Sequence, residues 1–251
     1  MKCVYSSVSI LFWLVTDVDV LKIEAVLLDL GNTLVKAWIP EVTYRSVLAS
    51  LRINRSVEEI REALESTERE FEEQNCRSMY GKVSYTEYWE KWDSQVLRNL
   101  GIAEDERLVK EVVERWFDHA DCVAYPDTKE TLAKLKQRNL KLGLISTGYE
   151  EDITAILKKA GLEKGLFDVV VGVNTIEKEK PDPEVFKYAL AMLQVKPEEA
   201  LFVGDKIDAD YEGAEKVGIH AILIQREQNS IGTRSDLRTI TSLEEILKFI
   251  D

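Results

Sequence analysis

Short apolar runs recur along the chain, separated by longer segments in which apolar residues follow a helical period. Runs of this length, alternating with helical segments, predict the buried strands of a parallel sheet with helices on both faces. We therefore expect an α/β fold with a doubly wound parallel sheet. The expected strands are 23–30, 140–146, 167–171, 200–205 and 220–224, and the expected helices between and after them are 127–138, 151–160, 184–193, a helix ending at 217, and 242–250.

The segment 38–121 interrupts this alternation, because its pattern is helical throughout. Ser56 with Glu59, and Ser84 with Glu87, have the capping-box spacing that begins a helix. We expect helices near 43–51, 56–75, 84–100 and 105–119. The predicted organisation is an N-terminal extension (1–22), an α/β core formed by 23–37 and 122–251, and an inserted all-helical domain (38–121).

The N-terminal extension fits neither pattern. Residues 9–15 are apolar and follow Lys2, as in a secretion signal, but the run is short and Asp17 and Asp19 follow it. It is also too short to cross a bilayer. We favour a segment packed on the core or a start codon assigned too early, ahead of an edge strand and of a signal.

Charge and cysteine content narrow the possible partners. The net charge of −13 disfavours a nucleic-acid or anionic membrane partner, which would require a clustered basic surface. Three scattered cysteines, Cys3, Cys76 and Cys122, indicate neither a disulfide framework nor a zinc site. We expect a cytoplasmic protein, a monomer or homodimer, whose partner is a small molecule.

The ends of the apolar runs carry chemically useful side chains in a fixed order. The first run leads into Asp29-Leu30-Gly31-Asn32-Thr33, the second ends in Ser146-Thr147-Gly148, Lys180-Pro181-Asp182-Pro183 opens a helix, and the fourth ends in Gly204-Asp205. Their order and spacing over residues 23–224 resemble the four motifs of the haloacid dehalogenase-like hydrolases. That family places a helical cap directly after its first motif, where this chain has 38–121.

The resemblance implies a catalytic mechanism. Asp29 would attack phosphorus and form an aspartyl-phosphate that water later hydrolyses. Asp29 and Asp205 would bind Mg²⁺ together with the backbone carbonyl of Gly31. Ser146 would donate a hydrogen bond to the transferring phosphoryl group, and Lys180 would neutralise its charge.

The same resemblance assigns supporting roles. Asp210 would orient Lys180 or the water molecules on the metal. Asn32, Thr33, Thr147 and Gly148 are candidate phosphate-binding residues. The implied substrate is a small phosphorylated metabolite.

Each of these residues also has an ordinary explanation. Ser146 could cap the following helix, Lys180 could be a solvated loop residue, and Asp205 could be a turn residue. Asp208 and Asp210 could be favoured by a helix dipole. We favour the catalytic interpretation because independent coincidences would have to occur in the right order at four successive positions.

Gly31 departs from the family pattern. The family has an aspartate there, which protonates the leaving group and later activates water, and such help is worth about 10²–10⁴-fold. Haloacid dehalogenases proper also lack this aspartate and use no metal, but they alter the Gly-Asp that this chain keeps at 204–205. We favour a magnesium-dependent phosphatase, with a 2-haloacid dehalogenase or a non-catalytic phosphate- or metal-binding protein as alternatives.

Aromatic residues are frequent in the inserted segment and beside it. They are candidates for a substrate pocket, although a small helical domain also needs aromatic residues for its own core, and for most of them we favour that second role. His119 and His220 have no partner motif, and we expect them to pack or to be exposed. The aromatic candidates are Trp38, Tyr80, Tyr85, Trp89, Trp92 and Trp116.

Overall fold

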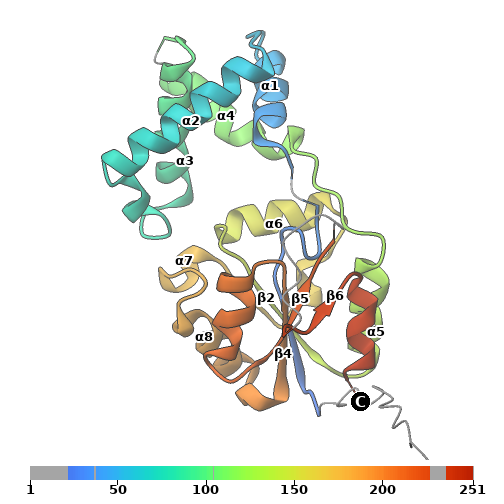
Figure 1. The fold of residues 1–251 in the computed structure, drawn as a ribbon. Helices are drawn as coiled ribbons and strands as arrows, with labels where there is room; N and C mark the ends of the chain where they lie inside the picture. The colour runs from blue at the N-terminus through green and yellow to red at the C-terminus, as the bar shows by residue number, and fades with distance from the viewer. Residues whose placement is uncertain (1–21, 37, 104, 227–235, 251) are drawn as a thin grey trace, which may run out of the picture.

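A six-stranded, all-parallel sheet forms the core of the protein (Figure 1). The computed structural model describes residues 22–36, 38–103, 105–226 and 236–250, so the prediction for the N-terminal extension falls almost wholly outside them. The strand order is β3-β2-β1-β4-β5-β6, and the predicted fold class is confirmed. The strands are β1 (Ala25–Leu28), β2 (Lys141–Ile145), β3 (Val169–Val171), β4 (Ala200–Gly204), β5 (His220–Ile224) and β6 (Thr239–Ile240).

Strand β1 lies at the centre of the sheet, between β2 and β4. Leu28, its last residue, pairs with Leu144 on one side and with Val203 on the other. The chain therefore leaves β1 and β4 at neighbouring points on the carboxyl edge. The strand order reverses at this point, and open α/β sheets bind ligands where that happens.

Both faces of the sheet are buried, which explains why its strands are continuous apolar runs in the sequence. Val26 and Leu28 of β1 face one hydrophobic core, and Ala25 and Leu27 face the other. The first core includes α5 (Thr128–Gln137), α6 (Glu150–Lys159) and η5 (Leu243–Lys248), and the second includes α8 (Pro183–Leu193) and α9 (Glu212–Glu215).

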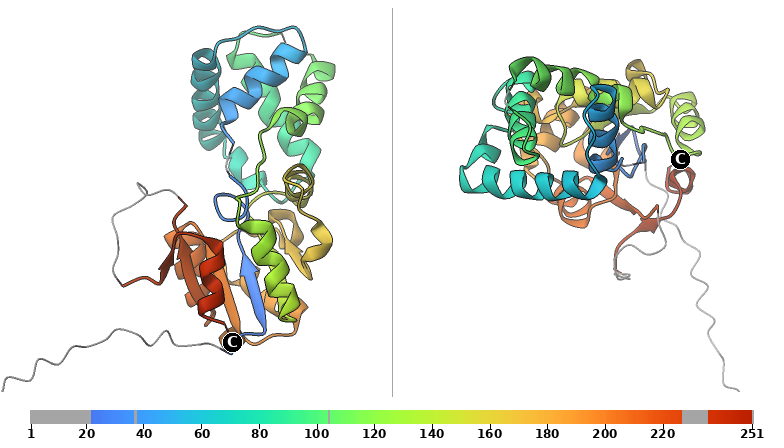
Figure 2. Two further views of the ribbon diagram at one scale, coloured as in Figure 1. Left: turned by 90° about the vertical axis from the view of Figure 1, so that its right-hand side faces the viewer. Right: turned by 90° about the horizontal axis from the view of Figure 1, so that it is seen from above.

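Four α-helices between β1 and α5 form the helical insertion, which lies above the carboxyl edge of the sheet (Figures 1 and 2). They pack on one another around a hydrophobic cluster of their own. Within the described residues, no helix combines the length and the apolar character that a membrane crossing requires. The insertion contains α1 (Pro40–Ser50), α2 (Val57–Glu73), the short 3₁₀ helix η1 (Cys76–Met79), α3 (Tyr85–Asn99) and α4 (Glu106–His119).

The chain leaves and re-enters the core at a single place. Val35 and Ala124 form an antiparallel bridge there, and Lys36 N donates a hydrogen bond to Val123 O at 2.9 Å. The outgoing and returning segments are thus held side by side below the insertion.

The predicted helix starts in the insertion are supported by their hydrogen bonds. At Ser56 the capping box is complete, because Glu59 N donates to Ser56 Oγ at 3.2 Å and Ser56 N donates to Glu59 Oε2 at 2.7 Å. At Ser84 the structure shows one half of the box, in which Glu87 N donates to Ser84 Oγ at 3.2 Å.

The largest differences from the predicted elements follow β3 and β4. The predicted helix ending at 217 begins instead as a π-helix, η4 (Ile207–Tyr211), and continues as α9. The predicted last helix is the 3₁₀ helix η5. Strand β6, the one-turn helix α7 (Val173–Ile176) and the short 3₁₀ helices η1, η2 (Lys164–Leu166) and η3 (Pro197–Glu199) were not predicted.

Candidate active site

A buried lysine joins two carboxylates at the carboxyl edge of the sheet. Lys180, in the loop before α8, donates to Asp29 Oδ1 and to Asp210 Oδ1, each at 2.6 Å. Asp29 follows β1 directly, and Asp210 lies in η4. The side chain of Lys180 is only 2% exposed, so this ion pairing takes place away from bulk water.

Burial and neighbouring charges shift the pKa values of Asp29 and Lys180. Burial raises the pKa of Asp29 to about 6, despite the opposing charge of Lys180. Burial alone would lower the pKa of Lys180, but Asp29 and Asp210 outweigh it, and the pKa of Lys180 is raised. The lysine therefore stays charged and offsets part of the negative charge of the two carboxylates.

Asp205, at the end of β4, completes a group of three carboxylates. One carboxylate oxygen from each of Asp29, Asp205 and Asp210 lies within 4.8 Å of the other two. Burial, and then the charge of Asp210, raise the pKa of Asp205. Crowded, partly desolvated carboxylates of this kind are stabilised by a cation between them.

The three carboxylates differ in how many of their oxygens accept hydrogen bonds. Both oxygens of Asp210 accept hydrogen bonds, Oδ1 from Lys180 and Oδ2 from Lys206 N at 3.0 Å. Asp205 Oδ2 accepts one from Asn32 Nδ2 at 3.3 Å. Asp29 and Asp205 therefore fit a hard cation such as Mg²⁺, which prefers oxygen ligands, while Asp210 fits the role of holding Lys180.

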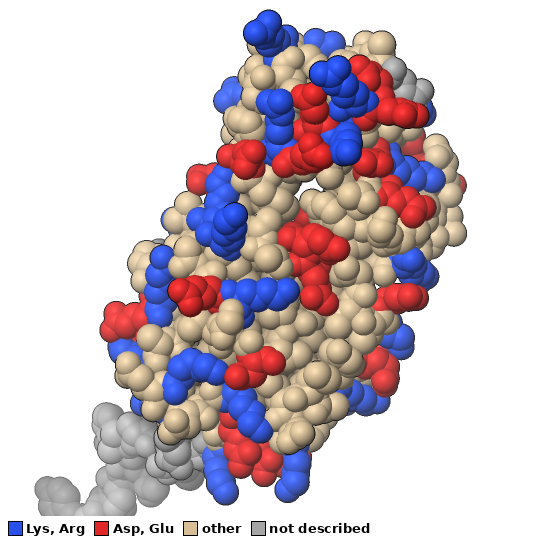
Figure 3. Space-filling model, turned by 180° about the vertical axis from the view of Figure 1, so that it is seen from behind, with Lys and Arg blue, Asp and Glu red and all other residues tan. Residues whose placement is uncertain are grey.

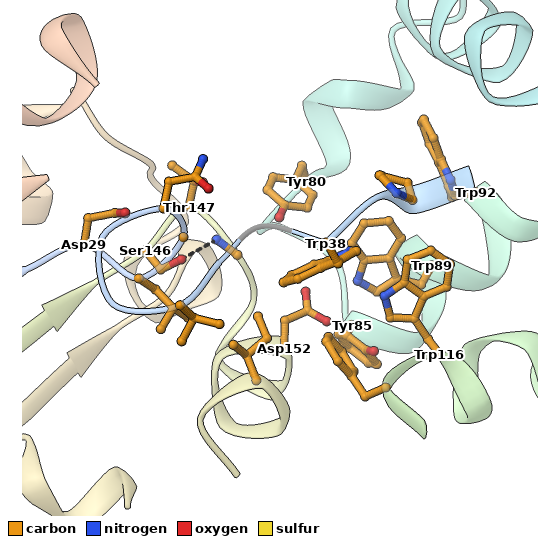
Figure 4. A pocket seen from close by; sticks show the side chains of 18 of the residues that line it. Asp29, Trp38, Tyr80, Tyr85, Trp89, Trp92, Trp116, Ser146, Thr147 and Asp152 are labelled. Atoms are coloured by element: carbon orange, nitrogen blue, oxygen red, sulfur yellow. Dashed lines mark hydrogen bonds between the residues drawn. The ribbon is translucent and has the colours of Figure 1, made fainter. Parts of the chain in front are cut away.

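Ser146 follows β2 and lines the same cavity, together with Thr147 and Gly148. Its Oγ accepts a hydrogen bond from Gly148 N at 3.3 Å, and the N-cap residue of α6 is Tyr149. The interpretation of Ser146 as an ordinary helix cap is therefore wrong. The serine and the first turn of α6 instead face the cavity beside Asp29 (Figure 4).

The loop after β1 contributes two of its three predicted residues to the cavity. Gly31 and Asn32 line it, and Asn32 has the left-handed φ of 55° that its place in the loop requires. Thr33 is fully buried outside the lining, and its Oγ1 has no hydrogen-bond partner among the described residues. Its carbonyl oxygen accepts two hydrogen bonds from Arg226, at 3.1 and 2.6 Å, so Thr33 anchors the loop from below.

The cavity above these residues is larger than a phosphate group requires. It has a volume of about 440 Å³ and extends from Asp29 into the helical insertion. The space-filling view from behind shows a hollow between the upper and lower parts of the molecule, with acidic side chains beside it (Figure 3). Beyond Ser146 and Thr147, aromatic rings dominate the walls (Figure 4).

The sequence left two positions open for the aromatic candidates, the wall of a substrate pocket and a hydrophobic core, and the structure shows them in both. All of them line the cavity, and all of them also pack against a hydrophobic cluster. Each of them has an aromatic neighbour at an edge-to-face angle; the Tyr80 and Trp89 rings, for example, lie 6.4 Å apart at 82°. The six are Trp38, Tyr80, Tyr85, Trp89, Trp92 and Trp116.

Two buried aspartates in the cavity wall were missed by the sequence analysis. Burial raises the pKa of both Asp93, in α3, and Asp152, in α6, to about 7. Asp93 accepts a hydrogen bond from the Tyr44 hydroxyl. Asp152 follows Glu150 and Glu151 in the first turn of α6, where acidic residues are common because of the helix dipole, so its position gave no signal.

The two histidines have ordinary hydrogen bonds, as the sequence led us to expect. His119 Nδ1 lies 3.0 Å from Ser46 Oγ, and His220 Nε2 lies 3.2 Å from Glu198 O. Neither histidine lines the cavity.

Comparison with known proteins agrees with this geometry. Residues 56–224 match the haloacid dehalogenase-like hydrolase family, a stretch that includes the second, third and fourth motifs and begins after Asp29. The chain belongs to this family. The haloacid dehalogenase-like hydrolase is thus an enzyme. Its buried lysine and its carboxylates lie at the carboxyl edge of the sheet, as expected.

Individual relatives share this similarity over different lengths of the chain. The hydrolase is 30% identical over 212 residues to a glyceraldehyde 3-phosphate phosphatase from Methanopyrus kandleri, covering 81% of this chain and 84% of that one. It is 36% identical over 120 residues to pyrophosphatase PpaX from Bacillus thuringiensis strain Al Hakam, covering 45% of this chain and 55% of that one.

Solved structures share the whole fold. A haloacid dehalogenase-like phosphatase from Thermococcus onnurineus superimposes with a TM-score of 0.60 at 26% identity, over 91% of this chain and 99% of that one. A 2-haloacid dehalogenase from Pseudomonas syringae pv. tomato DC3000 superimposes with a TM-score of 0.67 at 23% identity, over 90% and 97%. The second likeness concerns the fold alone.

Proposed function

We propose that this hydrolase is a magnesium-dependent phosphatase that cleaves small phosphate monoesters through an aspartyl-phosphate on Asp29. The observation that carries the proposal is Lys180, which holds Asp29 and Asp210 at 2.6 Å each on the floor of a large cavity. A nucleophile held by a fixed cation beside a second metal-binding carboxylate suits an anionic substrate. The phosphatase names of two relatives support the same conclusion.

The metal would be held by Asp29, Asp205 and the backbone carbonyl of Gly31. When bound, Mg²⁺ supplies positive charge for the phosphate oxygens and offsets the repulsion between the two carboxylates. Asp210 is assigned to holding Lys180, because both of its oxygens accept hydrogen bonds, from Lys180 and from Lys206 N. Asp29 and Asp205, in contrast, each keep one oxygen without a hydrogen bond to the described part of the chain.

The chain's own residues account for the covalent steps. Lys180 engages Asp29 Oδ1, and Oδ2 attacks phosphorus, forming the Asp29–phosphorus bond as the bond to the ester oxygen breaks. The Ser146 hydroxyl donates to a phosphoryl oxygen, and Asn32, Thr147 and the Gly148 backbone, which line the same cavity, bind the other phosphoryl oxygens. With glycine at 31, the departing alcohol takes its proton from water.

In the second half of the reaction, water attacks the phosphorus atom. The bond between phosphorus and Asp29 breaks, phosphate leaves, and Asp29 regains its carboxylate. Residues 38–121 act as a cap that excludes bulk water and binds the alcohol part of the substrate, while 23–37 and 122–251 form the core that performs phosphoryl transfer.

Metal removal and loss of the nucleophile test this proposal together. Phosphate release from a panel of monoesters should require Mg²⁺ and should stop in excess chelator. Asp29→Asn should lower kcat to below about one thousandth, because the variant lacks the attacking oxygen. Asp118→Asn, at an exposed position in α4, is the matched control and should keep full activity.

The alternatives predict different results. Full activity in excess chelator or in Asp29→Asn would rule out the proposed mechanism. Halide release from a 2-haloacid without metal would identify a dehalogenase, and phosphate binding without turnover of either substrate class would identify a binding protein.

A further inference from the structure

The half of the cavity next to the helical insertion contains aromatic rings and acidic groups, and the described lining residues place no cation there. Lys180 and Lys206 are the lining residues with cationic side chains, and both belong to the core near Asp205. The carboxyl groups of Asp93 and Asp152 lie in the wall, at 4% and 8% exposure. A second anionic group on the substrate would therefore meet carboxylates without a compensating charge.

Asp152 is the acidic group best placed to contact the alcohol part of a substrate. Its carboxyl group lies between the phosphate end of the cavity and the rings of Trp38 and Tyr85 (Figure 4). Tyr85 is a polar neighbour of this carboxyl group, and no lysine, arginine or histidine in the described part of the chain forms an ion pair with it. A buried carboxyl group without a cationic partner is costly to ionise, and a cationic ligand would relieve that cost.

The position of Asp152 relative to the phosphate end is fixed through Gly148. The point where a Cβ atom at Gly148 would lie is 3.8 Å from Ser146 Oγ and 3.9 Å from Asp152 Oδ2. The residue that binds phosphate and the unpaired carboxyl group thus flank the same short part of the cavity. A short alcohol attached to a phosphate at Ser146 would reach Asp152 with its far end.

We propose that this aromatic and acidic half of the cavity is a cation site, and that the preferred substrates are phosphate monoesters of amino alcohols. This inference rests on the proposed phosphatase activity. The positively charged nitrogen lies against Asp152, and the faces of the surrounding tryptophan and tyrosine rings contact its alkyl groups. Aromatic faces attract cations through their quadrupole, most strongly where water is excluded.

A pair of substrates of equal shape tests the charge alone. Choline phosphate carries a quaternary nitrogen where 3,3-dimethylbutyl phosphate carries a carbon atom. We expect kcat/KM for choline phosphate to exceed that for the neutral ester by at least about tenfold, since cation–π contacts and a buried carboxylate both favour the charge. A ratio of one or less, or a higher kcat/KM for phosphoglycolate, would overturn the proposal.

A variant at Asp152 tests the residue. In Asp152→Asn the shape of the side chain is kept and its charge is lost, so the ratio between the two esters should fall towards one. Glu151→Gln removes an exposed charge from the next position of α6 and should leave the ratio at its wild-type value. If Asp152→Asn retained the full ratio, the carboxyl group would have no part in selectivity.

A binding measurement separates this inference from the proposed activity. Four of the five tryptophans line the cavity, so free choline should change tryptophan fluorescence saturably, whereas 3,3-dimethylbutanol at equal concentration should not. Saturable choline binding without hydrolysis of any ester would contradict the phosphatase and retain the cation site. Mg²⁺-dependent hydrolysis of p-nitrophenyl phosphate with equal responses to the two alcohols would retain the phosphatase and overturn the cation site.

Discussion

Gly31 is the residue at which the first motif of this enzyme departs from the family pattern described above. Its backbone is outside the left-handed region, and a Cβ atom added there would meet no atom within 4 Å. Glycine is therefore not required by the backbone, and a side chain fits. The absence of a carboxyl group at 31 is a chemical property of the site, which can be restored by substitution.

Gly31→Asp should raise the turnover of poor leaving groups most. Alkyl phosphates need a proton on the departing oxygen and aryl phosphates need little, so the ratio of alkyl to aryl turnover should rise, up to the range of about 10²–10⁴ for a positioned acid. The ratio and the Mg²⁺ affinity are measured in wild type and variant. Gly165→Asp, where a Cβ atom also meets nothing within 4 Å, is the matched control. An unchanged ratio at unchanged Mg²⁺ affinity would show that protonation does not limit turnover.

The sequence predicts the positions of candidate site residues best where these residues follow strands. The positions of Asp29, Ser146 and Asp205 follow from apolar runs that end on one edge of a sheet, because parallel strands place their carboxyl ends together. Thr33 and Asp152 could not be placed in this way. The orientation of Thr33 depends on Arg226, almost two hundred residues away, and the burial of Asp152 depends on aromatic rings from a different part of the chain.

At the scale of elements, the end of β4 and the π-helix that follows it form one unit. A Cβ atom at Gly204 would overlap the carboxyl group of Asp210, so the close approach of strand and π-helix requires glycine. This contact places Asp210 where Lys180 can bind it. A conventional α-helix was predicted here, because the acidic residues at 208 and 210 suit a helix start and nothing in their pattern indicates the wider turn.

Gly204→Ala should therefore displace Asp210. We expect a loss of about 1–3 kcal/mol in the free energy of unfolding, as for other overpacked buried sites, and a clear decrease in kcat as Lys180 loses one partner. Denaturant unfolding and steady-state kinetics measure the two effects. Gly165→Ala serves as the control, since its Cβ atom meets no neighbour. Wild-type kcat in Gly204→Ala would mean that Asp210 does not position Lys180.

Short elements that depend on distant contacts were the hardest to predict. Strand β6 has two residues and exists because Leu223 N donates to Arg238 O and Gln225 N donates to Ile240 O. The long helices of the insertion, in contrast, contain their own signals in caps and periodicity, and these were predicted to within a few residues.

At the scale of the whole molecule, the helical insertion is seated on the core through a hydrophobic cluster that both parts share and through a few hydrogen bonds. Gly81 N, between η1 and α3, donates to the Tyr149 hydroxyl at 3.0 Å. Lys159 Nζ, at the end of α6, donates to the carbonyl oxygens of Phe117 and Asp118 at 2.6 and 2.7 Å. The closeness of the insertion to Asp29 depends on such contacts, because the insertion has its own hydrophobic cluster.

Gly81→Ala should displace the insertion from the core without changing any of the proposed catalytic residues. Gly81 has a φ of +74°, and a Cβ atom there would lie 2.9 Å from Val173 O, so the side chain pushes the two parts away from each other. We expect KM to rise by roughly tenfold as contacts to the alcohol part are lost, with Mg²⁺ affinity unchanged.

Gly101→Ala separates this effect from backbone strain. Gly101 has a similar φ of +68°, but a Cβ atom there would meet nothing within 4 Å. Both variants lose stability through strained backbone, and only Gly81→Ala should change KM. Equal KM values in the two variants would show that the seating of the insertion does not affect substrate binding.

The bridge between Val35 and Ala124 has an evolutionary consequence. Because the chain departs and returns at adjacent residues, an entire block of about eighty residues can be lengthened, shortened or exchanged by recombination while every strand keeps its neighbours. Lineages that share the phosphate chemistry of the sheet are free to acquire new alcohol preferences by inheriting a different block.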